Sequence, residues 1–352
     1  MPVIDADAHV IETPKTWSYL RGEEREFCPQ VFLRSNEDGA PYRSNQRHEY
    51  WVVDERMLSK NSNVGKDVPK EAGLMDDIER RLAHMDEIGI DIQVLFPSLF
   101  LRPITKEHDV EFALVRSYNR WLADIWRQSR DRLPWVALPP LLSLVDTAKV
   151  RDELAFCKEN GACGIFMRGM ECDRLLSHRY FFPLYEIAQD LDLAVTLHAG
   201  NNSYALHDGL PREASLMIFK FPVMGAFNQF LVEEVPQRFP GVRWAFIEAS
   251  AQWVPYVLGE VKLRLNARGR KASIDRLLTE SNFYITTQKT DDMPWLLSEI
   301  GDDNLIIGTD YGHRDTATEV EALKRLGQDG NLPQAAVNKI LRTNPGKLYG
   351  IA

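Results

Sequence analysis

The sequence has no long apolar segment and few cysteines. No stretch of its 352 residues approaches the ~20 apolar residues of a membrane-spanning helix, so membrane insertion is not expected. The N-terminal residues 1–7 have neither a basic segment nor a long apolar one, which argues against a signal peptide. The four cysteines, Cys28, Cys157, Cys163 and Cys172, form no Cys-x-x-Cys pair and indicate reduced thiols. We therefore expect a cytoplasmic protein.

Positive charge is also scarce. The chain has 42 Lys and Arg against 51 Asp and Glu, a formal net charge of −9, with a pI near 5.5. Nucleic acids and anionic membranes require clustered positive charge, so neither is an expected partner. A composition of 44% hydrophobic and 26% charged residues is typical of globular proteins. It excludes disordered, collagen-like and coiled-coil classes.

Short apolar runs alternate with amphipathic helical patterns, which is typical of a parallel sheet with crossover helices. The eight runs are Val3-Ile4 leading into Asp5–His9, Ile92–Phe96, Trp135–Leu138, Gly164–Met167, Leu193–Leu197, Val242–Ile247, Phe283–Thr286 and Leu305–Thr309. Helices are expected near Leu74–Glu87, Leu114–Ile125, Val145–Asn160, Phe181–Leu191, Ala214–Phe239, Ala251–Leu265 and Ala335–Thr343.

Eight strand–helix units predict a single (β/α)8 TIM barrel over residues 1–352. An open doubly wound sheet is the alternative, but it would need a Gly-rich phosphate turn after the first strand, and the sequence has none. Residues 13–73 are too many for an ordinary βα loop. They contain two hairpin arms, Val31–Leu33 and Tyr50–Val53, with a turn signal at Asn36–Gly39. We expect this segment to be an insertion that caps the barrel mouth.

Catalytic residues of such barrels follow the carboxyl ends of the strands. Asp7 and His9 lie two apart on the first strand and therefore point to the same side. With His198 and Asp310 at later strand ends, they form a set suited to one divalent ion, Zn²⁺ or Mn²⁺ rather than copper. Each residue alone has a simpler interpretation, because a buried His is often structural and a strand-end Asp often caps a helix. Four such residues at matching strand ends favour a metal site.

Several motifs together resemble a known family. Asp5-Ala6-Asp7-Ala8-His9-Val10-Ile11-Glu12 is similar to the first-strand signature of the amidohydrolase superfamily, in particular the branch of aminocarboxymuconate-semialdehyde, resorcylate and carboxyvanillate decarboxylases. The further matching motifs are Arg81–Asp91, Tyr118–Leu122, Phe239–Arg243, Gly308–His313 and Asn344–Gly350. The resemblance implies a metal-dependent barrel enzyme with one divalent ion and no organic cofactor, and it is compatible with a homodimer. The family ligands fall on Asp7, His9, His198 and Asp310.

Three positions depart from the family pattern. The first histidine of the superfamily signature is Asp7 here, although some decarboxylases of the branch have Glu at that position. The sixth-strand histidine of many relatives is replaced by Glu248, which we interpret as a metal ligand, an acid–base group or a partner for a nearby arginine. The proline of the Tyr-Pro-His turn is Gly312.

Two further polar residues have alternative roles. Arg168 is a candidate clamp for a substrate carboxylate, because guanidinium binds carboxylate bidentately. Its alternative is an ion pair with Glu171 or Asp173. His313 is a candidate catalytic residue that donates to substrate or orients Asp310, and its alternative is a hydrogen bond that only fixes the loop.

The remaining candidates lie around this set. Glu12 would support His9 from behind or lie on the rim. Trp253, Tyr204 and His207 would line a pocket for a flat substrate, although aromatic residues after barrel strands often serve packing.

Three functions fit these residues. The first is a metal-dependent decarboxylase of a small aromatic or unsaturated carboxylic acid, in which Asp310 protonates the carbon that loses carbon dioxide. The second is a hydrolase of a lactone, amide or activated C–C bond, in which Asp310 takes a proton from a metal-bound water. The third is a ligand-binding barrel without chemistry.

Overall fold

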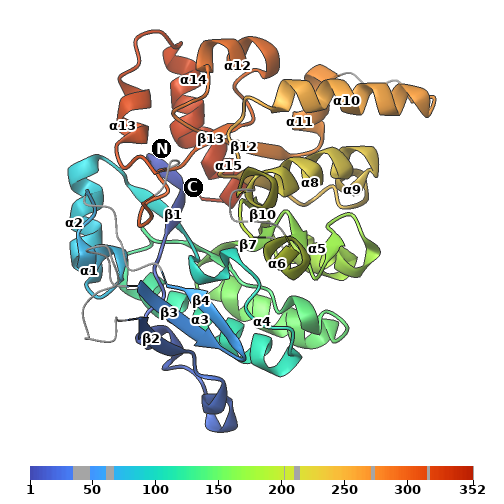
Figure 1. The fold of residues 1–352 in the computed structure, drawn as a ribbon. Coiled ribbons are helices and arrows are strands. Elements are labelled where there is room, and N and C mark those ends of the chain that lie inside the picture. Colours follow the sequence, from blue (N-terminus) through green and yellow to red (C-terminus); the bar gives the residue numbers. More distant parts are fainter. Residues whose placement is uncertain are drawn as a thin grey trace.

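The computed structural model describes residues 1–34, 48–60, 67–201, 203–209, 215–270, 274–314 and 318–351. Eight parallel strands form one sheet in the order β1-β5-β6-β7-β10-β11-β12-β13 (Figure 1). They are β1 Ile4–His9, β5 Ile92–Phe96, β6 Trp135–Ala137, β7 Ala162–Arg168, β10 Ala194–His198, β11 Trp244–Ile247, β12 Phe283–Thr287 and β13 Leu305–Ile307. The predicted (β/α)8 barrel is confirmed.

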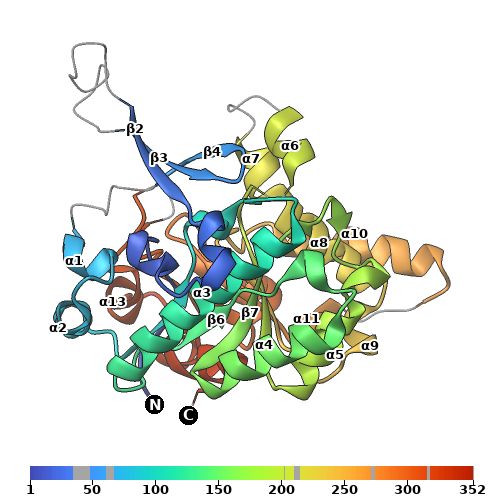
Figure 2. The ribbon, with the colours of Figure 1, turned by 90° about the horizontal axis from the view of Figure 1, so that it is seen from below.

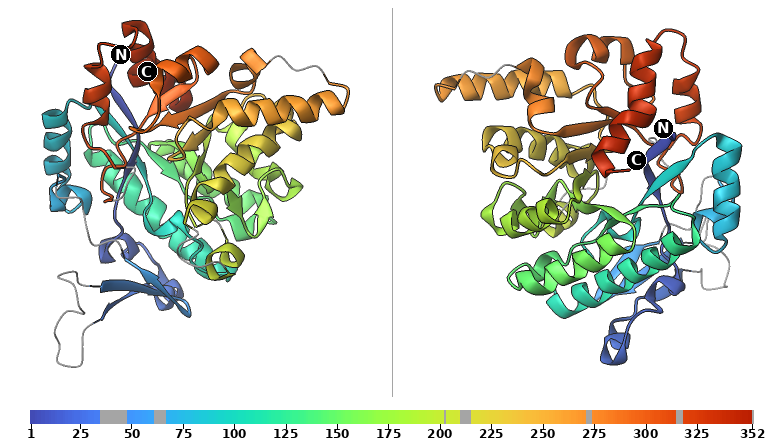
Figure 3. Two further views of the ribbon diagram at one scale, coloured as in Figure 1. Left: turned by 45° about the horizontal axis from the view of Figure 1, so that its top comes forward. Right: turned by 180° about the vertical axis from the view of Figure 1, so that it is seen from behind.

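The sheet closes between its first and last strands. Ala8 bridges Tyr311 in parallel, and the His9 N–H donates to the Tyr311 carbonyl at 2.7 Å. The Asp310 N–H donates to the Asp7 carbonyl at 2.9 Å. The C-terminal helices consequently lie beside the N-terminal strand, with the two chain ends close together (Figure 3).

Helices surround the sheet. They are α1 Lys70–Gly73, α2 Ile78–Ile88, α3 His108–Gln128, α4 Thr147–Glu159, α5 Phe182–Asp190, α6 Tyr204–Gly209, α7 Ser215–Phe219, α8 Phe221–Val232, α9 Val235–Arg238, α10 Val254–Ala267, α11 Ile274–Glu280, α12 Met293–Ile300, α13 Ala322–Gly327, α14 Gln334–Asn338 and α15 Asn344–Tyr349. Several helices begin after a residue whose side chain caps the first turn. Asp77, for example, precedes α2 and accepts from the Arg80 N–H at 2.9 Å. No helix among the described residues is long and apolar enough to cross a membrane.

Two sequence predictions need correction. The single helix expected over Ala214–Phe239 is three helices, because Pro222 and Pro236 each stand in the first turn of a new helix and Glu234 is left-handed, with φ of 57°. The last strand ends at Ile307 rather than Thr309, because the Thr309 N–H and hydroxyl turn to the Asp5 carboxylate.

The segment 13–73 has two parts. Near its start, 3-10 helices η1 Pro14–Trp17 and η2 Gly22–Phe27 lie along α3. Further on, β2 Gln30–Arg34, β3 His48–Val53 and β4 Arg56–Ser59 form an antiparallel sheet. Figure 2 shows this sheet on the side of the barrel away from both termini. The predicted arms pair as a hairpin, whereas the turn signal at residues 36–39 lies outside the described residues.

This sheet contacts loops that follow barrel strands. Arg102 donates to the Ser59 hydroxyl at 2.9 Å, and the Thr105 hydroxyl donates to Asp54 at 3.0 Å. The Arg56 guanidinium lies 3.7 Å from the centre of the Tyr204 ring. The contacted loops follow β5 and β10, so the sheet packs at the carboxyl ends of the strands.

A buried polar cluster joins α3, α4 and β6. Asn119 donates to the Leu138 carbonyl and accepts from the Leu138 N–H, both at 3.0 Å, which fixes the end of β6. Its amide also donates to Glu153 on α4 at 2.9 Å. Arg120 binds the same carboxylate through both guanidinium ends, at 2.6 and 2.8 Å. These contacts give a physical role to the motif Tyr118–Leu122.

We predict that Glu153→Ala lowers the free energy of unfolding by ~3–5 kcal/mol, because it leaves the partly buried Arg120 and the buried Asn119 without their acceptor. Urea denaturation followed by circular dichroism measures this. Lys15→Ala is the control, since it removes an exposed ion pair with Asp76 and should cost less than ~1 kcal/mol. Equal losses in the two variants would contradict the role given to Glu153.

Candidate active site

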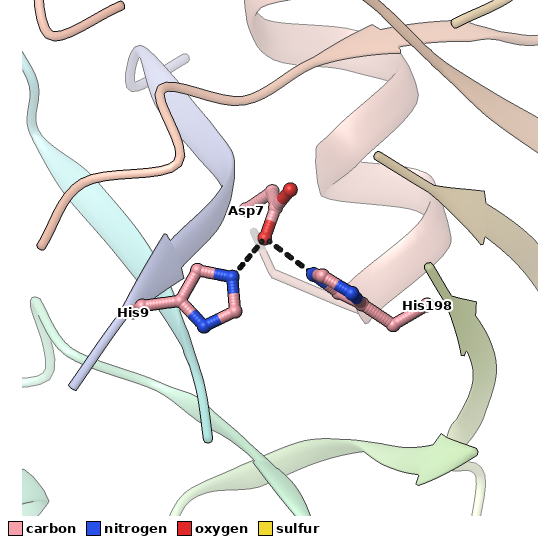
Figure 4. Close-up of side chains that lie close together, drawn as sticks. All are labelled: Asp7, His9 and His198. Carbon is pink, nitrogen blue, oxygen red and sulfur yellow. Dashed lines mark hydrogen bonds and ion pairs between the residues drawn. The ribbon is translucent and has the colours of Figure 1, made fainter. Parts of the chain in front are cut away.

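Four predicted side chains meet at the carboxyl end of the barrel. Asp7 lies between His9 and His198, and its Oδ1 is 3.4 Å from His9 Nε2 and 3.3 Å from His198 Nε2 (Figure 4). Asp310 approaches the same His9 nitrogen at 3.3 Å through its Oδ1. All four residues are buried. Asp7, His9 and His198 place one ligand atom each within 4.8 Å of one another, as do His9, Asp310 and His313.

Backbone carbonyls fix the tautomers of both histidines. His9 Nδ1 is 2.9 Å from the Pro97 carbonyl, and His198 Nδ1 is 2.7 Å from the Ala199 carbonyl. A carbonyl only accepts hydrogen bonds, so each Nδ1 carries a proton and each Nε2 is the nitrogen that faces Asp7. This is how second partners orient metal-binding imidazoles.

The electrostatic environment favours the ligand forms of His9 and Asp7. Burial, and then the positive charge of His313, lower the pKa of His9 to about 3, so its imidazole is neutral. Burial opposes ionisation of Asp7, but the neighbouring His198 and His9 outweigh it and lower the pKa of its carboxyl. The buried His9 Nε2 has no hydrogen-bond partner in the described part of the chain. A neutral, unsatisfied imidazole nitrogen beside carboxylates fits a divalent cation.

His313 and Asp310 form a tight pair. His313 Nδ1 is 2.7 Å from Asp310 Oδ1, and His313 Nε2 is 2.8 Å from the Ser98 hydroxyl. That hydroxyl donates its own proton to the Val10 carbonyl at 2.6 Å, so it must accept from His313 Nε2. His313 Nδ1 is the nitrogen left to face Asp310, and the two groups form a close ion-pair contact.

Glu12 supports the site through the backbone. Its carboxylate accepts from the Ser98 and Leu99 N–H groups, at 3.1 and 2.8 Å. The turn that it holds supplies the Pro97 carbonyl to His9 and the Ser98 hydroxyl to His313. Burial raises the pKa of Glu12 to about 7. The expected support of His9 therefore takes an indirect form, by way of the turn at Pro97–Leu99.

Two site residues have left-handed backbones. Glu248 has φ of 60° and Asp310 has φ of 52°, a conformation that costs non-glycine residues energy and is concentrated at functional sites. Glu248 is buried at the end of β11, and its Oε2 lies 3.6 Å from His198 Nδ1. Its N–H donates to the Thr286 hydroxyl at 2.7 Å. The Thr318 hydroxyl donates to Asp310 at 2.7 Å.

Gly312 explains one departure from the family pattern. Its φ is +96°, and a Cβ atom there would lie 3.0 Å from the His9 carbonyl oxygen. Proline, with φ fixed near −65°, cannot adopt this backbone. The turn that carries His313 therefore has its own geometry, in which glycine is required.

Arg168 is engaged by the protein. Its guanidinium binds both carboxylate oxygens of Glu171 and donates to the Phe100 carbonyl at 3.2 Å. The ion pair is thus with Glu171, one of the two alternatives from the sequence. Because Glu171 fills the bidentate face, Arg168 is not an open carboxylate clamp in this structure.

The predicted aromatic residues separate in space. Trp253 packs on Phe227, with ring centres 5.0 Å apart, and its indole N–H donates to the Ala249 and Ser250 carbonyls. It is not among the described residues that line the 240 Å³ cavity described below, and its contacts are those of a packed side chain. Tyr204 is buried and does line a cavity. The side chain of His207 lies outside the described part.

A cavity of about 240 Å³ opens beside the cluster, at the ends of β6 and β7. Phe166 lines it, and the Phe166 ring centre is 6.0 Å from that of His198. A space of about 10 Å³, room for one water, lies against Asp7, Glu248 and Asp310 themselves. The larger cavity is therefore next to the cluster and is not formed by it.

Sequence reasoning missed three supporting residues. They are Ser98, which hydrogen-bonds His313, Thr318, which hydrogen-bonds Asp310, and Asp5, which hydrogen-bonds Thr309. Except for Thr318, each is more than 200 residues from its partner, so no local spacing could reveal the contact.

Buried carboxyl and imidazole groups lie together at the carboxyl ends of the barrel strands. This is where TIM-barrel enzymes place their active sites. The family model for amidohydrolases matches residues 4–351. The chain therefore belongs to the amidohydrolase family, a family of enzymes, and the resemblance found in the sequence is confirmed. No curated protein matches the sequence.

Solved structures share the fold at low sequence identity. An amidohydrolase from Mycobacterium avium subsp. paratuberculosis is 18% identical, with a TM-score of 0.78 and 99% of each chain covered. A 5-carboxyvanillate decarboxylase from Sphingomonas paucimobilis is 15% identical, with a TM-score of 0.69 over 100% of this chain and 99% of that one. A dihydroxybenzoic acid decarboxylase from Polaromonas sp. JS666, with bound manganese and 2-nitroresorcinol, is 21% identical, with a TM-score of 0.63 over 80% and 88%.

Glu111, which lines the cavity, generates a pH prediction. Burial raises the pKa of its carboxyl to about 8, while its Oε2 accepts from the Leu142 N–H at 2.7 Å. Between about pH 4.5 and 8 the folded protein keeps a proton that the unfolded chain releases, so this group lowers stability as pH rises. Glu111→Gln keeps an acceptor oxygen and does not titrate.

We therefore expect wild type to lose, between pH 5 and 8, on the order of a few kcal/mol of unfolding free energy relative to Glu111→Gln. Urea titrations at both pH values measure the difference. The same change at the exposed Glu299 on α12 is the matched control and should parallel wild type. Parallel pH profiles for wild type and Glu111→Gln would contradict the assignment.

Proposed function

We propose that this protein is a metal-dependent decarboxylase of a small aromatic or unsaturated carboxylic acid. The observation that carries the proposal is the contact of 2.7 Å between His313 Nδ1 and Asp310 Oδ1, beside the candidate metal ligands, from which we infer that the two groups share a proton. Decarboxylation needs an acid at this point, because the carbon that loses carbon dioxide must gain a proton. The decarboxylases of similar fold support the same reaction class.

The proposed metal ligands are Asp7, His9, His198 and Asp310. The fit rests on the neutral His9 imidazole, the two Nε2 atoms that face the cluster and the ionised Asp7 carboxylate. Mixed imidazole and carboxylate ligands suit Zn²⁺ or Mn²⁺, and manganese is bound in the dihydroxybenzoic acid decarboxylase of similar fold. A divalent ion here would act as a Lewis acid toward the substrate carboxylate and an adjacent oxygen.

The protein's own groups would manage the proton. The bond between the carboxylate and its carbon breaks, the electron pair stays on that carbon, and the carbon takes the proton from Asp310 as carbon dioxide leaves. His313 positions Asp310 and restores its proton through the short contact at 2.7 Å. Glu248, whose Oε2 lies 3.6 Å from His198 Nδ1, would hold that imidazole in its orientation. We further propose that the sheet β2–β4 covers the mouth and limits the access of water.

A hydrolase is the second candidate. It is favoured by the space for one water against Asp7, Glu248 and Asp310, where Asp310 would accept a proton from the attacking water. The two candidates differ in products. Decarboxylation releases carbon dioxide without incorporating solvent oxygen into the organic product, whereas hydrolysis in ¹⁸O-water labels it.

The metal assignment predicts that His198→Ala, reconstituted with Mn²⁺ or Zn²⁺, binds the ion at least ~100-fold more weakly than wild type. Loss of a residue that only hydrogen-bonds a metal ligand already lowers metal affinity ~10–100-fold. Metal content by mass spectrometry and affinity by competition with a chelator measure this. His178→Ala is the control, because His178 is exposed and only caps a short 3-10 helix. A folded His198→Ala protein with wild-type metal affinity would overturn the ligand assignment.

The proton assignment predicts that Asp310→Asn lowers turnover by ~10²–10⁴-fold, the usual contribution of an acid–base group. Turnover is measured as carbon dioxide release over a panel of aromatic and unsaturated carboxylic acids at saturating metal. Asp303→Asn makes the same chemical change at an exposed carboxylate bound to Lys339, and should keep the wild-type rate. A wild-type rate in Asp310→Asn would exclude both the decarboxylase and the hydrolase mechanism.

A further inference from the structure

The 240 Å³ cavity lies one strand away from the candidate metal ligands. Arg168 at the end of β7 is in register with His198 at the end of β10, so the two residues are neighbours in the ladder. Phe166, two residues earlier on β7, lines the cavity and has its ring beside that of His198. The cavity therefore begins where the cluster ends, on the same face of the barrel.

The lining of this cavity is mixed, with a large apolar part. Its apolar side chains include Phe100, Ile104, Val115, Leu138, Leu142 and Phe166. Its buried and half-buried charged groups have partners in the protein: Arg168 binds Glu171, Glu111 accepts from the Leu142 N–H, and Arg102 donates to Ser59. Lys106, Asp173 and Arg174 are exposed and lie at the rim.

The size of the cavity indicates what it holds. An apolar cavity of about 150 Å³ in a protein core accommodates one benzene molecule. A space of about 240 Å³ accommodates a ring and several further carbon atoms. None of the four candidate ligands is among its lining residues in the described part of the chain, so the reacting carboxylate cannot be in this space and at the ion together.

We propose that the substrate carries an apolar extension of several carbon atoms beyond its reacting carboxylate, and that this extension occupies the cavity between β6, β7 and α3. The inference rests on the proposed function for the position of the carboxylate. It names a substrate class larger than a simple benzoic acid. The burial of apolar atoms against Leu138, Leu142 and Phe166 would supply the binding energy.

The test measures binding, not turnover. Benzoates with unbranched alkyl chains of zero to five carbons at the 3- or 4-position are titrated into the manganese-loaded full chain by calorimetry. Affinity should rise about fourfold for each methylene in at least one of the two series, until the cavity is full. A flat profile in both series, or no binding by any member, would overturn the proposal.

Variants locate the extension. Leu142→Trp fills the cavity and should reduce the ratio of pentylbenzoate to benzoate affinity to nearly one, and the smaller Leu142→Phe should reduce it in part. Leu263→Trp places the same side chain on the exposed face of α10 and should keep the wild-type ratio. A wild-type ratio in both folded Leu142 variants would exclude this cavity as the binding place.

The outcome is independent of the reaction class. If no acid releases carbon dioxide but affinity still rises with chain length, the proposed function fails and the extension pocket stands. If small acids are decarboxylated and both series are flat, the function stands and the pocket assignment fails.

Discussion

Closure of the barrel at its first and last strands is the constraint on which the site depends. The buried Asp5 carboxylate accepts from the Thr309 N–H and hydroxyl and from the Gln93 amide, at 2.5 to 2.9 Å. These bonds bend the chain out of β13 directly before Asp310. Asp7 and His9 thereby meet a residue from the opposite end of the chain. Burial raises the pKa of Asp5 to about 7, so this joint relies on hydrogen bonds more than on charge.

The same geometry carries a conformational cost. Asp310 and Glu248 adopt left-handed backbones, which an L-residue does only where the surroundings hold it. At Asp310 the holding groups are the Asp7 carbonyl and the Thr318 hydroxyl, and at Glu248 the Thr286 hydroxyl. The backbone is strained where the carboxylates must turn inward, and neighbouring strands supply the bonds that keep it there.

The predictable features of this protein are those set by local periodicity. Apolar runs located all eight strands, and the two-residue spacing of Asp7 and His9 placed both on one face. A predicted strand end was wrong where a residue distant in the sequence determines it, as at β13, whose end depends on hydrogen bonds to Asp5. Glu171, the partner of Arg168, lies three residues away and could be predicted from the sequence. Ser98, the partner of His313, lies far away in the sequence and could not. The roles of the site residues remain predictions.

The charges in the cluster argue for a cation. Asp7 is ionised, His9 is neutral, and Glu248 and Asp310 place two further buried carboxyl groups around the same two imidazoles. A proton on the His313–Asp310 pair would offset one negative charge at most. Buried anions are costly unless they are paired or bind a metal. A divalent ion at the two Nε2 atoms would neutralise negative charge there. The same buried carboxyl groups that are costly for the protein alone therefore support metal binding.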